Sequence, residues 1–301
     1  MKKSLLLATN TSSEDELFDY ISSTFKDKIT TWDYFVNWQK VFKNVDSIEI
    51  ELNILNSVIG KPNLQKELFD LIKQYPQVIV TFPALIALRE KSVDILIDSS
   101  KFIYKNYNFK KRTLNDSEIS DLSEFIIKSG LGEILSDRRI KNLVDYVTGV
   151  EVGLDSNGRK NRGGTLMENI VEVYIKDLCA RNNLEYLSQA NAAKIEAKWG
   201  IKIEVDKSSR IIDFVIKKGN QLYFIEVNFY GGGGSKLKST ATEYHGMHGY
   251  WHGQKIIFIW ITDGNGWVST LKPLREYFDK TDYLLNLNML EKGILEKIIN
   301  A

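Results

Sequence analysis

The chain has 301 residues, of which 43% are hydrophobic and 26% are charged, so it is long enough to bury one large core or two smaller ones. Forty basic residues against 39 acidic ones leave a net charge of +1. This balance excludes a strongly basic or acidic protein, but it does not exclude a local basic surface.

The sequence favours a globular cytoplasmic protein. No apolar stretch approaches the roughly 18 residues of a membrane helix. The apolar run Leu5–Ala8 is too short for the core of an export signal. Cys179 is the single cysteine, which excludes an internal disulfide, and its apolar neighbours predict a buried, inert thiol.

Residues 1–145 are predicted to form a mainly helical region. Apolar residues recur at spacings of three and four, and prolines separate the segments. The predicted helices are Glu14–Phe25, Trp32–Phe42, Ile48–Ile59, Asn63–Tyr75 and Ile119–Ser129. Asn63 is expected to cap the helix that it opens, Asp116–Glu118 to start the last helix, and Gly130 to end it.

Residues 146–301 are predicted to form a second region with a mixed sheet. Gly149–Gly164 is rich in glycine, asparagine and basic residues and is expected to be a loop before a helix over Thr165–Asn182. The predicted strands are Lys202–Val205, Arg210–Lys217, Gln221–Tyr230 and Lys255–Thr262, with a helix around Leu237–Tyr244. This order indicates an α/β or α+β fold, a mixed sheet flanked by helices.

The strongest local signal is a β-hairpin. Gly219-Asn220 separates two β-rich runs and suits a two-residue turn. If these two residues form the loop, Lys218 faces Gln221 and the next pairs are apolar, including Phe214 with Ile225.

The same register places Asp213 opposite Glu226. Like charges in directly opposed positions destabilise a sheet, and carboxylates among apolar residues resist desolvation. A divalent cation between them would remove both problems, since Mg²⁺ prefers carboxylate, water and phosphate oxygens. The alternative is that the acids lie at a sheet edge or pair with Arg210 or a lysine.

Two glutamates on the predicted helix Thr165–Asn182 are candidates to support this site. Glu168 lies in its first turns, and Glu172 follows one turn later on the same face. Most helix glutamates are simply solvated, so the sequence alone does not decide between them.

Two basic segments are candidate DNA contacts. Arg159, Lys160 and Arg162 lie in the predicted loop before this helix, where they can meet phosphates or guanine edges. Ser235, Lys236 and Lys238 follow four glycines after the second hairpin strand. These glycines do not form a P-loop, whose residue order is different, but they allow close approach to a ligand.

Other motifs carry weaker expectations. His245, His248 and His252 are all the histidines of the chain, and their spacing suggests a zinc site. Glycines between them instead favour a surface loop. Trp260 and Trp267 are predicted to be core residues, and Asp263 a turn former.

The pattern Asp213, twelve residues, then Glu226-Val-Asn228 resembles the Asp…(Asp/Glu)-x-Lys signature of the restriction-endonuclease fold. In that fold the hairpin binds Mg²⁺. Asn228 replaces the usual lysine and cannot supply its positive charge, so we expect it to position water by hydrogen bonding. The resemblance assigns metal ligation to Asp213 and Glu226, with Val227 and Glu168 as further ligands.

The chain resembles the DpnII/MboI-type restriction endonucleases through most of its length. The segments that carry this resemblance are Trp32–Phe35, Lys43–Asp46, Asn142–Arg162, Met167–Val171, Asp213–Ile216, Ile225–Tyr230, Gly234–Leu237 and Trp260–Gly264. The resemblance implies Mg²⁺-dependent double-strand cleavage of unmethylated 5′-GATC-3′, on the 5′ side of the guanine. It also implies a host adenine methyltransferase that protects the site. A palindromic target suggests a two-fold homodimer.

Two other functions share these features. A nicking or structure-specific nuclease, of the mismatch-repair or junction-resolving type, would use the same acids on the same fold. A DNA-binding protein with a decayed site would bind without cutting.

Overall fold

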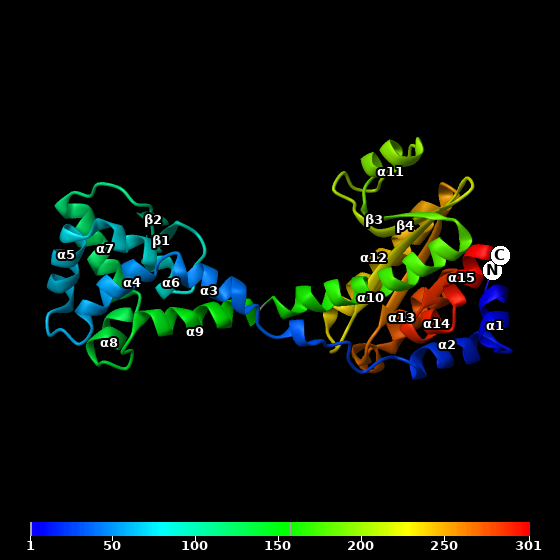
Figure 1. Cartoon of the computed structure of the whole chain (residues 1–301), viewed down its shortest axis with the longest axis horizontal. Coiled ribbons are helices and arrows are strands. Elements are labelled where there is room, and N and C mark those ends of the chain that lie inside the picture. The colour runs from blue at the N-terminus through cyan, green and yellow to red at the C-terminus, as the bar shows by residue number, and fades with distance from the viewer. Residues whose placement is uncertain (1, 157) are drawn as a thin grey trace. The chain divides into compact units, whose positions relative to one another are not determined.

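The computed structural model describes residues 2–156 and 158–301, apart from the side chains of Asp33, Arg159, Lys160 and Asn161. The chain forms two compact units (Figure 1). The inserted unit is Trp32–Arg159, and the terminal unit combines Met1–Thr31 with Lys160–Ala301. The expected division near residue 145 is therefore wrong in two respects. The first 31 residues belong with the C-terminal region, and the inserted unit runs on to residue 159.

The inserted unit is mainly helical, as the sequence predicts. Its elements are η1 Trp32–Tyr34, α3 Trp38–Asp46, α4 Glu49–Leu55, η2 Asn56–Val58, α5 Leu64–Gln74, η3 Pro76–Thr81, α6 Phe82–Leu85, β1 Ser92–Asp98, β2 Ile103–Asn108, α7 Asp116–Lys128, α8 Leu131–Ser136 and α9 Leu143–Ser156. Asn63 accepts a hydrogen bond from the Lys66 backbone nitrogen, which confirms the predicted cap. The antiparallel hairpin β1–β2 was not predicted.

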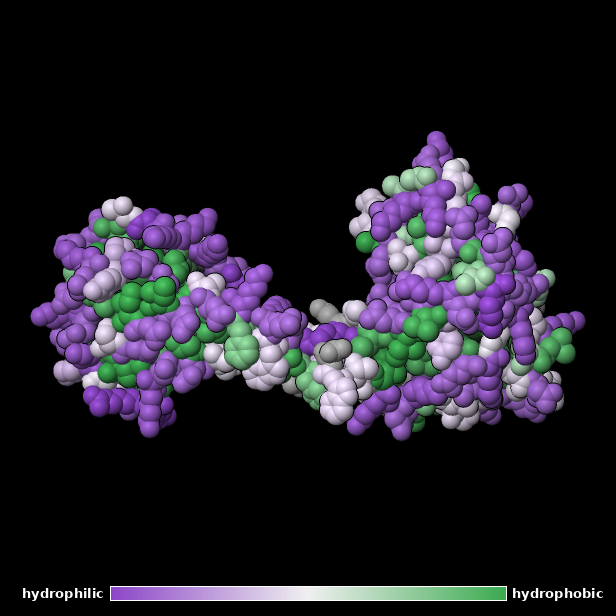
Figure 2. Space-filling view, viewed as in Figure 1, coloured by the Kyte–Doolittle hydropathy of each residue, from purple (hydrophilic) through white to green (hydrophobic). Residues whose placement is uncertain are grey.

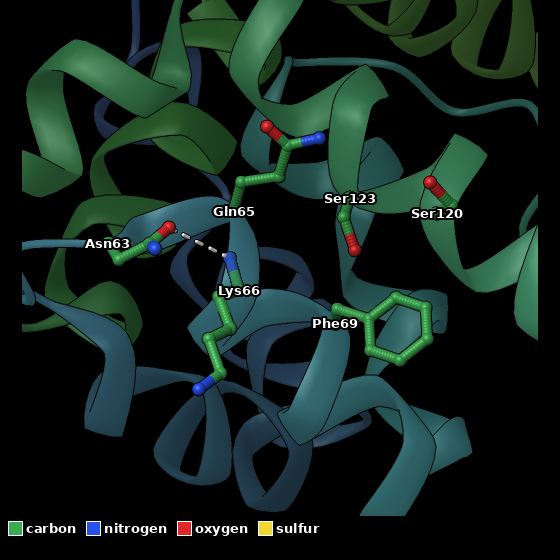
Figure 3. A pocket seen from close by; sticks show the side chains of 6 residues that line it. All are labelled: Asn63, Gln65, Lys66, Phe69, Ser120 and Ser123. Carbon is green, nitrogen blue, oxygen red and sulfur yellow. Dashed lines mark hydrogen bonds between the residues drawn. The ribbon is translucent and has the colours of Figure 1, made fainter.

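The inserted unit has its own hydrophobic core, to which Phe82, Phe109 and Phe125 contribute. A cavity of about 250 Å³ is lined by Asn63, Gln65, Lys66, Phe69, Ser120 and Ser123, from α5, its cap and α7 (Figure 3). Asn63 is engaged as the helix cap, and the Ser123 hydroxyl donates to the Ile119 carbonyl at 2.8 Å. These two polar groups therefore support the fold.

The terminal unit is built around one mixed sheet. Its elements are α1 Lys3–Thr9, α2 Glu14–Ser23, α10 Arg159–Asn182, β3 Glu185–Ala190, α11 Ala192–Trp199, β4 Ile212–Lys218, β5 Gln221–Phe229, α12 Ser235–Gly253, β6 Ile257–Asp263, η4 Asn265–Ser269, α13 Leu271–Lys280, β7 Tyr283–Leu285, α14 Leu287–Glu291 and α15 Ile294–Asn300. The strand order is β3-β4-β5-β6-β7; β3, β4 and β5 are antiparallel, and β5, β6 and β7 are parallel.

Helices cover both faces of this sheet. On one face the α12 ring of Trp251 packs against Phe224 of β5, and Tyr277 of α13 packs against Trp260 of β6. On the other face Tyr223 donates from its hydroxyl to the Ile299 carbonyl of α15. The expected mixed sheet flanked by helices is confirmed.

Lys202–Val205 is not a strand, contrary to the prediction. The side-chain amide of Gln254 accepts from the Glu204 backbone nitrogen at 3.0 Å and donates to the Glu204 carbonyl at 3.1 Å. A side chain thus satisfies backbone groups that a neighbouring strand would otherwise pair. The sheet position next to β4 is taken by β3, which was not predicted.

The expected loop Gly149–Gly164 is also wrong, because α9 continues to Ser156 and α10 begins at Arg159. Two buried acids hold α9 in place. Glu151 accepts two hydrogen bonds from Arg89 at 2.6 and 2.7 Å, and Asp155 accepts one from the Asn37 backbone nitrogen at 3.0 Å. These tertiary contacts outweigh the low helix propensity of the glycines.

The visible face of each unit is mostly hydrophilic (Figure 2). Hydrophobic residues lie there in separate patches. Among the described residues, no helix is both long enough and apolar enough to cross a membrane.

Candidate active site

The hairpin β4–β5 has the predicted register. Lys218 pairs with Gln221, and the ladder continues to Phe214 with Ile225. Asp213 and Glu226 come next, where regular pairing ends. There the Val227 backbone nitrogen donates to Asp213 Oδ2 at 2.8 Å instead of to the opposite strand. The side chain of Asp213 thus interrupts the β4–β5 hydrogen-bond ladder and binds the backbone of β5 at Val227.

Asp213 and Glu226 form a pair of carboxyl groups, in which Glu226 is buried and Asp213 is half-buried. Glu226 is only 6% exposed. Burial first, and Asp213 second, raise the pKa of Glu226 well above its ordinary value. Burial also raises the pKa of Asp213, and hydrogen bonds from Val227, Gln189 and Glu226 oppose the rise. Such a pair resists carrying two negative charges and is expected to share a proton when no cation is present.

One oxygen of Glu226 is unused. Its Oε2 accepts from the Tyr244 hydroxyl at 3.0 Å, whereas no described residue donates a hydrogen bond to the buried Oε1 while both acids are ionised. A buried oxygen without a partner is costly unless another ligand binds it. Oε1 is therefore a natural position for a cation.

Gln189 of β3 connects Asp213 to Glu168. Its side-chain nitrogen donates to Glu168 Oε2 at 2.8 Å and to Asp213 Oδ1 at 3.3 Å. Gln189 has a positive φ of 47° and lies between the pairs Ser188–Phe214 and Ala190–Ile212, which keep one register. This register places Gln189 opposite Asp213. Burial, followed by the charge of Asp213, raises the pKa of Glu168.

Glu172, the competing candidate, lies elsewhere. It accepts from the Tyr186 hydroxyl at 3.0 Å and pairs with Lys176 at 3.4 Å. Of the two helix glutamates, Glu168 is the one that the structure brings to the acid pair.

A chain of hydrogen bonds runs from the buried Trp260 to Glu226. The Trp260 indole nitrogen donates to Asn228 Oδ1 at 2.6 Å, and Asn228 Nδ2 donates to the Tyr244 hydroxyl at 3.1 Å. Burial first, and Glu226 second, raise the pKa of Tyr244 far above its ordinary value, so it remains a hydroxyl donor. The sequence did not indicate Tyr244 or Gln189, because a helix phase places Tyr244 and the unpredicted strand β3 carries Gln189.

Arg210 does not pair with the hairpin acids. It binds Asp206 at 2.6 Å and Glu243 at 3.2 Å, although its charge opposes the rise in the pKa of Glu226. The alternative in which Arg210 neutralises the acids by an ion pair is therefore not supported.

The predicted DNA-contacting residues fall in two places. The side chains of Arg159 and Lys160 lie outside the described residues, and Arg162 is half-buried. Ser235, Lys236 and Lys238 are exposed in the first turn of α12. The partial positive charge of a helix N-terminus favours anions there.

The histidines lie in α12 and not in a surface loop. That helix forms despite its glycines because Leu237, Tyr244, Met247 and Trp251 recur on one buried face. His248 contacts Asp282 at 3.3 Å. In the part of the chain that the structure describes, no group of three His, Cys, Asp or Glu side chains is arranged to hold a metal.

A site with fewer than three ligating side chains suits a cation that needs few protein ligands. Mg²⁺ is usually held by one or two carboxylates together with water and substrate phosphates. Asp213 and Glu226, with an unpartnered oxygen, fit such a cation. Glu168 lies further off, behind the amide of Gln189.

Comparisons with known proteins agree along almost the whole chain. The model of the family described as DpnII restriction endonuclease matches residues 17–297. The chain belongs to the DpnII restriction endonuclease family. The type II restriction enzyme MjaIII of Methanocaldococcus jannaschii is 47% identical over 94% of this chain and 99% of its own length. DpnII of Streptococcus pneumoniae is 41% identical over 93% and 98%, and MboI of Moraxella bovis is 34% identical over 93% and 95%.

The family resemblance inferred from the sequence is thus confirmed. This member of the DpnII family is a type II restriction endonuclease, a site-specific deoxyribonuclease that hydrolyses phosphodiester bonds of DNA. Type II restriction enzymes generally use a divalent metal. The predicted burial of Cys179, Trp260 and Trp267 is also confirmed.

Proposed function

We propose that this restriction endonuclease makes Mg²⁺-dependent double-strand cuts in DNA at unmethylated 5′-GATC-3′, on the 5′ side of the guanine. The observation that carries the proposal is the pairing of half-buried Asp213 with buried Glu226, in which no described residue donates a hydrogen bond to Glu226 Oε1. The sheet, with an acid-bearing hairpin followed by parallel strands, supports a restriction-endonuclease-like fold.

In this proposal the acids hold the metal. Asp213 and Glu226 contribute carboxylate oxygens, the Val227 carbonyl contributes a further oxygen, and Glu168 acts from the adjacent helix, directly or through water. When bound, Mg²⁺ would activate the attacking water and stabilise charge on the scissile phosphate. Asn228 completes the active site as its third residue.

In the same proposal, two basic segments bind DNA. One segment contributes Arg159, Lys160 and Arg162. The other is the N-terminus of α12, which contributes Ser235, Lys236 and Lys238 and whose backbone N–H groups also favour phosphate. A palindromic site is read most simply by a two-fold homodimer. A cognate adenine methyltransferase protects the same sequence in the host.

The test is a digest of plasmid DNA that is either unmethylated or adenine-methylated at GATC. We expect discrete GATC fragments from the unmethylated plasmid only. Nicked circles would favour a nicking or structure-specific nuclease, and binding without cleavage under any divalent metal would favour a decayed site.

Substitution of the acids tests the site itself. Asp213→Ala and Glu226→Ala should each abolish cleavage while DNA binding in Ca²⁺ is retained. Glu172→Ala is the matched control, since this glutamate faces Tyr186 and Lys176, and it should cut at the wild-type rate. Cleavage at a wild-type rate by either acid variant would show that the assignment is wrong.

A further inference from the structure

We infer that Tyr244 is a positioning residue for Glu226, and that Asn228 acts on the site through Tyr244 and not by orienting water. This inference rests on the proposed function, because it takes Glu226 as a metal ligand. It concerns the chain of hydrogen bonds from Trp260 through Asn228 and Tyr244 to Glu226.

The direction of every bond in this chain is fixed by its first member. The indole nitrogen of Trp260 can only donate, so the Asn228 atom at 2.6 Å must be the oxygen. The amide nitrogen of Asn228 then faces Tyr244 and donates to its hydroxyl oxygen at 3.1 Å. The hydroxyl hydrogen of Tyr244 is thereby left for Glu226 Oε2, 3.0 Å away.

The chain is anchored in the most buried part of the terminal unit. Trp260 is 0% exposed and Tyr244 is 7% exposed. Trp260 also lies beside Glu226 in the parallel pairing of β5 with β6, and Tyr244 packs edge-on against the Trp260 ring. Three elements, β5, β6 and α12, therefore fix the Tyr244 hydroxyl before any ligand binds.

The two oxygens of Glu226 therefore have different roles, one as a hydrogen-bond acceptor and the other as a metal ligand. Oε2 accepts from Tyr244, which fixes the side-chain torsions, and Oε1 is left for the cation. Hydrogen bonds to a ligating carboxylate typically affect metal affinity as strongly as 10–100-fold. The neutral Asn228 at the position of the usual lysine is explained by this role, which requires a donor and an acceptor but no charge.

The test measures metal binding and cleavage separately in the full chain. Tyr244→Phe removes one oxygen and keeps the ring. We expect Mn²⁺ binding to the DNA-free protein, measured by calorimetry, to weaken about 10-fold or more. Cleavage should require correspondingly more Mg²⁺ and recover to within a few-fold of wild type at excess Mg²⁺. Unchanged Mn²⁺ affinity in a folded Tyr244→Phe protein would overturn the inference.

Tyr250→Phe is the matched control, since Tyr250 lies on the same helix and its ring packs against Trp251. It should bind Mn²⁺ and cut as wild type does. A loss of Mn²⁺ affinity in this control equal to that of Tyr244→Phe would assign the effect to α12 in general and overturn the inference.

Asn228→Ser separates the two roles of Asn228. If Asn228 acts through Tyr244, this variant weakens Mn²⁺ binding, and the double variant with Tyr244→Phe is no weaker than the weaker single variant. If Asn228 orients water, the variant instead lowers the rate at saturating Mg²⁺, leaves Mn²⁺ affinity unchanged, and adds to the effect of Tyr244→Phe. That second pattern would contradict the inference.

Failure of the inference can be told apart from failure of the proposed function. Glu226→Ala, measured alongside, should lose Mn²⁺ binding and cleavage. If it loses both while Tyr244→Phe resembles wild type, only the positioning role is wrong. If Glu226→Ala itself binds Mn²⁺ and cuts, the proposed site is wrong as well.

Discussion

At the scale of single residues, the position of Glu226, the proposed metal ligand, has an energetic cost. Its carboxyl group is almost fully buried beside Asp213, and one of its oxygens lacks a partner among the described residues. A group placed in this way makes the metal-free protein less stable, and a bound cation compensates for it. Asp263 shows the contrasting case, a buried aspartate whose oxygens accept from the backbone nitrogens of Lys26, Gly264 and Leu287.

We expect Glu226→Gln to show this cost as a pH-dependent gain in stability. The pKa of Glu226 is raised on folding, so the folded protein retains a proton that the unfolded chain releases above about pH 4.3. The free energy of unfolding of the metal-free wild type therefore falls as the pH rises from the ordinary pKa of glutamate to the raised pKa of folded Glu226. Glutamine does not ionise and avoids this loss.

The measurement is thermal unfolding in EDTA at pH 5 and pH 8. The Tm difference between Glu226→Gln and wild type should be more positive at pH 8, by about 2–4 °C for each kcal/mol involved. Glu172→Gln, at the glutamate bound to Tyr186, is the control for replacing a glutamate elsewhere in this unit. A Glu226→Gln difference that is equal at both pH values, or smaller at pH 8, would contradict the argument.

At the scale of elements, the turns after β5 and β6 are joined by backbone hydrogen bonds and pack closely together. The Tyr230 carbonyl accepts from the Gly266 backbone nitrogen at 2.7 Å, and the Tyr230 nitrogen donates to the Asp263 carbonyl at 2.9 Å. A Cβ on Gly266 would lie 2.4 Å from the Gly232 carbonyl oxygen. The glycine-rich turn that leads into α12 is therefore held against the end of β6.

Gly266→Ala should separate these two turns. We expect it to lower the free energy of unfolding by about 1–3 kcal/mol, because the backbone must shift. It should also weaken DNA binding, since the turn places Ser235, Lys236 and Lys238, which are proposed to bind DNA. Gly232→Ala is the matched control in the same turns: a Cβ there meets no atom within 4 Å, and the expected change is within about 0.5 kcal/mol. Urea unfolding and a DNA-binding titration measure both, and equal effects of the two variants would refute the argument.

The elements also show what sequence reasoning can and cannot reach. The hairpin register was predictable because the Gly219-Asn220 turn and the alternation of apolar residues are local signals. The helical course of Gly149–Ser156 was not, since it depends on contacts of Glu151 with Arg89, 62 residues away. The two acids followed from the hairpin register, whereas Gln189 lies on the unpredicted strand β3 and Tyr244 is placed by the phase of a helix.

At the scale of the whole molecule, the first 31 residues complete the terminal unit. Leu5, Leu17, Phe18 and Ile21 are buried in its core. The Ile21 carbonyl accepts from Asn286 at 2.9 Å, and the Lys26 nitrogen donates to Asp263 at 2.6 Å. Burial of four such side chains contributes about 1.5–3 kcal/mol each, a sum comparable with the entire stability of a typical domain, about 5–15 kcal/mol.

We therefore expect a fragment of residues 160–301 not to fold on its own, and a rearranged chain to restore it. The two ends of the protein lie close together in the terminal unit, where α1 contacts α15 (Figure 1). A chain of residues 160–301, a short glycine-serine linker and residues 2–31 keeps every core contact of this unit and removes the inserted unit. It should unfold cooperatively on heating, whereas residues 160–301 alone should show no cooperative transition. Residues 32–159 are continuous and have a separate core, so they should also unfold cooperatively. A cooperative transition of residues 160–301 alone, at the temperature of the rearranged chain, would show that the N-terminal helices are dispensable.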